Sequence, residues 1–150
     1  MEKEQLYKEL VSLIAPRVIA ENFELLQIVE KPTSITLYFE EKDQRIPEEI
    51  KGKEAVQDGY LNKMELQTFP LKDKTVYIAV RRRRWKERGT PEQSYSNRYD
   101  LHFEGMKTTK EFGIFLKEEL GFEPDEYNKF WQRITDQGSD PLSMVQERTE

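Results

Sequence analysis

Hydrophobic residues recur with two different periods along this chain, and each period predicts one type of secondary structure. Near the N-terminus Leu6, Leu10 and Leu13 recur at helical spacing, which predicts a helix over Glu2–Ala15. Pro16 ends that helix because proline lacks the amide hydrogen that a helix interior needs, and Arg17–Asn22 is expected to form one more short turn of helix.

Further along, apolar and polar residues alternate, which is typical of strands that bury one face. The alternation predicts a hairpin of Phe23–Glu30 with Ser34–Glu41 and a third strand at Lys63–Phe69. The polar stretch Lys42–Asp58 contains a proline and a glycine, so it is predicted to be a loop with one helical turn at Glu48–Ile50.

The stretch Val76–Trp85, VYIAVRRRRW, joins an apolar strand pattern to four successive arginines, and we predict one strand over its whole length. Lys86–Ser94 is predicted to be a loop, after which Tyr95–Glu104 returns as the antiparallel partner. Matching the apolar faces requires Val80 opposite Leu101. This register puts Arg81 opposite Asp100, Arg82 opposite Tyr99 and Arg83 opposite Arg98, and gives the sheet a basic outer face.

The C-terminal third predicts two helices. Thr108 and Glu111 fit a capping box, and Gly121 stands where the end of that helix needs a positive φ. Pro124 opens a second amphipathic segment, and residues 136–150 have no period and are predicted to be a disordered tail. The predicted fold is α+β, in a single domain over residues 1–135: an antiparallel sheet of about five strands packed by the N-terminal helix and two C-terminal helices.

Composition excludes several kinds of chemistry. The chain has 150 residues and no cysteine, which excludes disulfides, thiolate metal sites and a cysteine nucleophile. Its one histidine, His102, follows Asp100 at strand spacing, and we interpret it as a surface residue rather than a base. No phosphate-binding glycine loop or nucleophile motif occurs. We therefore expect no enzymatic activity, no cofactor and no metal, and the absence of a long apolar run indicates a cytoplasmic protein without a membrane partner.

The charge is unevenly distributed, and this distribution points to an anionic partner. The net charge is −5, yet residues 51–110 carry 14 Lys and Arg against 8 Asp and Glu, between two acidic ends. Arginine presents a planar fork of donors suited to phosphate, and tryptophan offers a ring on which a base can stack. The candidate nucleic-acid contacts are Arg81, Arg82, Arg83, Arg84, Trp85, Lys86, Arg88 and Arg98.

Three stretches together resemble the N-terminal region of bacterial insertion-sequence transposases of the ISAon type. They are Val76–Trp85, Arg98–Leu101 and the pair Thr108–Phe112 with Phe115–Lys117, and the similarity spans about residues 1–120. The resemblance implies a non-catalytic front piece of a transposition system that contacts DNA through Arg81–Trp85 and Arg98, beside a catalytic transposase chain encoded downstream.

Two other interpretations of the arginine run stay open. The acidic segments could neutralise the arginines within the fold, because exposed ion pairs are common although each contributes only about 0–1 kcal/mol. Alternatively, the chain is a protein-interaction or assembly module without direct nucleic-acid contact, whose basic strand docks on an acidic surface or on a second copy of the chain.

Overall fold

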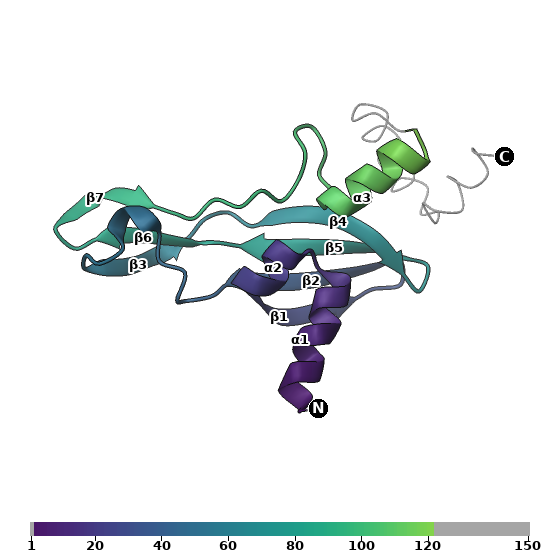
Figure 1. The fold of residues 1–150 in the computed structure, drawn as a ribbon, viewed down its shortest axis with the longest axis horizontal. Helices are drawn as coiled ribbons and strands as arrows, with labels where there is room; N and C mark the ends of the chain where they lie inside the picture. Colours follow the sequence, from purple (N-terminus) through teal and green to yellow (C-terminus); the bar gives the residue numbers. More distant parts are fainter. Residues whose placement is uncertain (1, 122–150) are drawn as a thin grey trace. The chain divides into compact units, whose positions relative to one another are not determined.

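The computed structural model describes residues 2–121, so the predicted second C-terminal helix and the tail lie outside the described residues. Its elements are labelled in Figure 1. The helices are α1 (Lys3–Ile14), α2 (Arg17–Asn22) and α3 (Lys110–Ile114), with a short 3-10 turn η1 (Glu48–Ile50) and a π-helical turn η2 (Phe115–Glu119). The strands are β1 (Phe23–Glu30), β2 (Ser34–Glu41), β3 (Ala55–Tyr60), β4 (Met64–Leu71), β5 (Lys74–Arg81), β6 (Arg83–Glu87) and β7 (Thr90–Tyr95).

The fold class is α+β, as predicted, but the strands within residues 2–121 number seven and form two sheets rather than one sheet of about five. Four strands have the order β1-β2-β5-β4, and three have the order β3-β6-β7. The prediction missed β3 and β7 and assigned both to loops. Their sequences, AVQDGY and TPEQSY, have no sustained apolar alternation, so the periodicity that identified the other strands was missing here.

The prediction of one strand over Val76–Trp85 is wrong, because the chain changes sheets in the middle of the arginine run. β5 ends at Arg81 and β6 begins at Arg83. At the junction the carbonyl of Arg82 accepts a hydrogen bond of 3.0 Å from the amide of Leu61. The predicted strand Tyr95–Glu104 is also wrong beyond Tyr95: residues 96–104 are irregular, and the neighbours of β5 are β2 and β4.

The described chain forms two compact units. Of the described residues, the first unit comprises 2–27, 38–64 and 79–100, and the second comprises 28–37, 65–78 and 101–121. The core of the first unit contains α2, the ends of several strands and the 3-10 turn. Its most buried apolar side chains are Ile19, Phe23, Phe39, Ile50, Val80 and Trp85.

In the second unit the sheet and the last helix share an aromatic core. Phe112 is fully buried and packs edge-on against Phe69, at 5.0 Å between ring centroids. Thr109 caps α3 by accepting a hydrogen bond of 3.4 Å from the amide of Phe112, so the cap lies one residue after the predicted Thr108. Gly121 has φ of 74° and its amide donates to the carbonyl of Lys117, as predicted for the end of this helix.

Helix α1 forms where the leucine spacing predicts it, but it buries none of its residues. Leu6, Leu10 and Leu13 are 52%, 56% and 83% exposed. The helix is tied to the first strand by the hydroxyl of Tyr7, which donates to the carbonyl of Leu25 at 3.2 Å. The expectation that this helix packs on the sheet through its leucines is therefore not met, and the apolar stripe faces solvent. None of the helices in residues 2–121 is long and apolar enough to cross a membrane.

Candidate nucleic-acid interface

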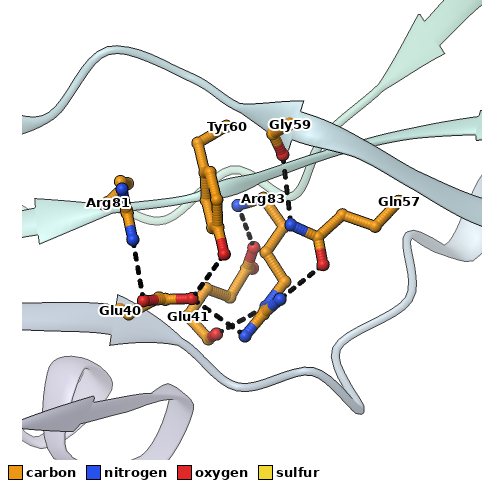
Figure 2. Close-up of polar contacts among 7 residues, drawn as sticks. All are labelled: Glu40, Glu41, Gln57, Gly59, Tyr60, Arg81 and Arg83. Atoms are coloured by element: carbon orange, nitrogen blue, oxygen red, sulfur yellow. Dashed lines mark hydrogen bonds and ion pairs between the residues drawn. The ribbon is translucent and has the colours of Figure 1, made fainter. Parts of the chain in front are cut away.

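The arginine run contains two sets of side chains with different surroundings. Arg81, at the end of β5, and Arg83, at the start of β6, both bind the carboxylate of Glu40 on β2 (Figure 2). The nitrogen–oxygen distances are 2.9 Å and 3.1 Å. The side chain of Arg83 is only 16% exposed, whereas that of Arg81 is 45% exposed. For Arg83 the interpretation of internal neutralisation holds, whereas Arg81 is paired with Glu40 but keeps nearly half of its side chain at the surface.

Tyr60 and Glu40 hold these two arginines in place. The guanidinium carbon of Arg81 lies 3.8 Å from the centroid of the Tyr60 ring, which is within the range of a cation–π contact. The Tyr60 hydroxyl donates to the carboxylate of Glu40 at 2.8 Å. Burial opposes ionisation of Glu40, but the hydrogen bonds from Arg81 and Tyr60 and the two guanidinium charges outweigh it and lower the pKa of this carboxyl.

Glu41, the next residue of β2, is a fully buried carboxylate. It accepts hydrogen bonds of 2.9 Å from the amide of Arg83 and from the side-chain nitrogen of Asn97, and a third from the hydroxyl of Tyr99. Its own carbonyl accepts from Nε of Arg83 at 2.8 Å. A buried charge is tolerated only when it is well hydrogen bonded, so this cluster ties two other segments of the chain, the start of β6 and residues 96–104, to the end of β2.

The Tyr99–Glu41 contact predicts a loss of stability at alkaline pH. Burial, followed by the hydrogen bond to Glu41 and its charge, raises the pKa of Tyr99. A group with a raised folded pKa stabilises the fold below its unfolded pKa of about 10 and loses that contribution as the pH rises further. Denaturant unfolding from pH 8 to pH 11 should show a free energy that falls above about pH 10. Tyr99→Phe should flatten this slope, and an unchanged slope in that variant would contradict the assignment.

Two further residues of the run also point inward. A guanidinium nitrogen of Arg82 donates to the carbonyl of Asn97 at 2.9 Å. Trp85 is buried, with 6% of its surface exposed, and its indole Nε1 has no hydrogen-bond partner within the described residues. Trp85 is thus part of the core of the first unit and offers no open ring face for a base.

The second set of cations, which we call the outer cations, comprises Arg84 and Lys86 at alternate positions of β6 and Arg88 just after its end. Their ion pairs are long: Arg84 and Lys86 lie 3.7 Å and 3.8 Å from the carboxylate of Asp58, and Arg88 lies 3.9 Å from that of Glu54. Nε of Arg84 also donates a hydrogen bond of 2.8 Å to the carbonyl of Asp58. The side chains of Arg84 and Arg88 are 43% and 73% exposed. Arg98 is also exposed, and no hydrogen bond or ion pair to it is found within residues 2–121.

Sequence reasoning missed Glu40, Glu41, Tyr60 and Asn97. The period-two pattern Ile35-Leu37-Phe39 continues to Glu41, and the buried positions of β2 follow that pattern to its end, so this signal could have identified Glu41 as buried. Tyr60 lies in a segment without periodicity, and Asn97 lies in the stretch that was wrongly predicted to be a strand. Nothing in the sequence marks either residue as a partner of the arginines.

Comparisons with known protein families, curated proteins and solved structures found no match to this chain. Within residues 2–121, no three His, Asp or Glu side chains gather in a way that could hold a metal ion. The only histidine, His102, has Nδ1 at 2.8 Å from the carbonyl oxygen of Phe103.

Proposed function

We propose that this chain is a non-catalytic nucleic-acid-binding module of an insertion-sequence transposition system, which holds DNA through phosphate contacts. The supporting observation is the set of outer cations, whose side chains are 33% to 73% exposed and whose ion pairs are long, at 3.7 to 3.9 Å. The resemblance to ISAon-type transposases supports the same assignment and suggests a downstream catalytic chain as a partner.

The proposed contacts differ from the continuous run that the sequence indicates. Phosphate binding requires guanidinium or ammonium groups with nitrogen atoms that can reach a partner from the surface. Ion pairs at 3.7 to 3.9 Å between half-exposed groups contribute little to stability, so the outer cations can exchange the carboxylates of Asp58 and Glu54 for phosphates at low cost, while Nε of Arg84 keeps its hydrogen bond to the carbonyl of Asp58. Arg98 adds a fourth contact of the same kind. Arg83 and Trp85 instead stabilise the fold.

We expect the salt dependence of binding to report the number of these contacts. With about four phosphates neutralised, log affinity for duplex DNA should fall with log salt with a slope of about −3 to −4. Arg84→Ala combined with Arg88→Ala removes two contacts, so the slope should become about −2, for every DNA sequence alike. Fluorescence anisotropy with a labelled duplex between 50 and 200 mM salt measures both slopes.

The matched control for that double variant is Arg17→Ala. Arg17 is more exposed than either of them, at 90% of its side chain, but lies on α2, where it pairs with Glu21 at 2.6 Å. This variant should leave the affinity and the slope unchanged. Absence of salt-dependent binding by the wild-type protein, or equal effects of Arg17→Ala and the double variant, would count against phosphate contacts at β6.

A second candidate function, an assembly module, is favoured by a different observation. An exposed stripe of three leucines on a helix with no buried residue is unusual, because amphipathic helices normally bury their apolar face. Such a stripe fits contact with another protein chain better than contact with DNA.

Light scattering separates the two functions. If α1 mediates assembly, the wild-type mass should exceed 18.0 kDa without DNA, and Leu10→Asp should return it to the monomer value while duplex binding persists. A monomeric wild-type protein would remove self-assembly from consideration. Loss of assembly in the Arg84→Ala, Arg88→Ala variant, with α1 unchanged, would place the contact on the basic surface instead.

A further inference from the structure

The first unit contains a shallow hollow on the face of the sheet that also presents Glu40 and Arg81. It has a volume of about 240 Å³. Its lining comes from three strands and the segment before β4: Leu26 from β1, Tyr38 and Glu40 from β2, Ala79 and Arg81 from β5, and Lys63. Apolar groups, an aromatic ring and two cations therefore lie within one small concave surface.

The arrangement of these groups matches the chemistry of a nucleotide. A nucleobase is flat and stacks on aromatic rings of any kind, while its phosphates need cations close by. Tyr38 is half-buried and Leu26 is exposed, which gives an aromatic surface and an aliphatic surface beside each other. The ammonium group of Lys63 lies 5.2 Å from the centroid of the Tyr38 ring, and Arg81 lies at the rim with its side chain 45% exposed.

Glu40 also lines the hollow, and its charge does not oppose an anionic ligand. Its carboxylate is bound by both Arg81 and Arg83 and by the hydroxyl of Tyr60, so one negative charge faces two positive ones. The carboxylate of Glu41 also binds the amide of Arg83, so the two arginines and the two glutamates of this cluster balance each other and the charge of Glu40 is neutralised by its partners. The guanidinium carbon of Arg81 lies 3.8 Å from the centroid of the Tyr60 ring, which keeps that group in position at the rim.

We infer that this hollow binds an unpaired nucleotide, with the base against Tyr38 and Leu26 and the phosphates at Arg81 and Lys63. The inference rests on the proposed nucleic-acid-binding function and extends it from duplex phosphates to single-stranded segments. Bases inside a duplex are stacked on each other and cannot enter such a hollow, so this surface distinguishes single-stranded from double-stranded nucleic acid.

The test compares two variants of the full chain against two probes, a fluorescein-labelled oligothymidylate and a labelled duplex of equal length. Tyr38→Leu keeps an apolar side chain but removes the ring, and Tyr38→Phe keeps the ring. We expect Tyr38→Leu to weaken single-strand binding by about 5- to 100-fold, since stacking on one base accounts for an effect of that size. Tyr38→Phe should bind like the wild type, and neither change should alter duplex binding.

The outcomes separate this inference from the proposed function. If the wild-type protein binds the duplex and Tyr38→Leu binds single strands normally, the nucleotide site in the hollow is contradicted, but the proposed duplex contacts of the outer cations are not. If the wild-type protein binds neither probe, both proposals are contradicted. An equal loss on both probes, or a loss also in Tyr38→Phe, overturns the stacking role. Repeating the titration with an oligouridylate RNA and comparing its affinity with that of the DNA oligonucleotide shows whether ribose or deoxyribose is preferred. Thermal unfolding of each variant identifies any loss of binding that is caused by misfolding.

Discussion

Glu41→Ala should lower the free energy of unfolding by about 3–5 kcal/mol, the largest effect expected for any polar residue described here. The substitution removes a fully buried carboxylate and leaves the donors of Asn97, Tyr99 and the Arg83 amide without their acceptor. Unpaired buried donors are costly because the hydrogen bonds they made to water in the unfolded chain are not replaced. Urea denaturation with an unchanged m-value measures the difference.

The control for this prediction is Glu49→Ala. Glu49 is an exposed glutamate in the 3-10 turn, so its loss should change the free energy of unfolding by less than about 0.5 kcal/mol. A loss below about 1 kcal/mol in Glu41→Ala would show that the cluster around Glu41 does not hold the first unit together.

Trp85→Ala should destabilise the protein by about 3–5 kcal/mol, since truncating a buried tryptophan leaves a large cavity. Trp85→Phe should cost much less. The smaller ring leaves less empty volume, and the change also removes an indole N–H that has no partner within the described residues. Chemical denaturation of both variants tests this difference.

The same two variants also test whether the indole contacts nucleic acid. If Trp85 serves only the core, Trp85→Phe should bind duplex DNA with the wild-type affinity once folded. A marked loss of affinity in a stable Trp85→Phe protein would mean that the indole is exposed to the ligand in the bound state.

Much of the fold could be predicted because its larger sheet obeys simple periodicity. The bounds of β1 and β2 follow from alternating apolar residues. The tight turn before β5 is formed by Lys72 and Asp73, whose φ values are 52° and 61°. The small sheet could not be predicted in this way. Its strands are largely polar, and their partners are determined by contacts such as Gln57 opposite Trp85 that no local pattern encodes.

The sequence identified the arginine run as the candidate site, but it did not predict which way each arginine side chain points. Four consecutive arginines on one strand would place two on each face, and that expectation fails at Arg82, where the chain changes sheets. The inward direction of Arg83 depends on Glu40 and Glu41, which lie more than forty positions earlier in the chain. Pairing across such a separation depends on strand order, and strand order was the part of the topology that the sequence left undetermined.

The central claim is that Arg83 stabilises the fold, whereas its neighbour Arg84 binds a polyanion. Measuring both stability and DNA binding on variants of these two residues tests this claim most directly. The free energy of unfolding and the salt slope of duplex binding are determined on the same samples of Arg83→Ala and Arg84→Ala. We predict that Arg83→Ala loses about 2–3 kcal/mol of stability and, where folded, keeps the wild-type slope. Arg84→Ala should lose less than about 1 kcal/mol and flatten the slope by about 0.9. A flattened slope in Arg83→Ala together with an unchanged slope in Arg84→Ala would contradict the account.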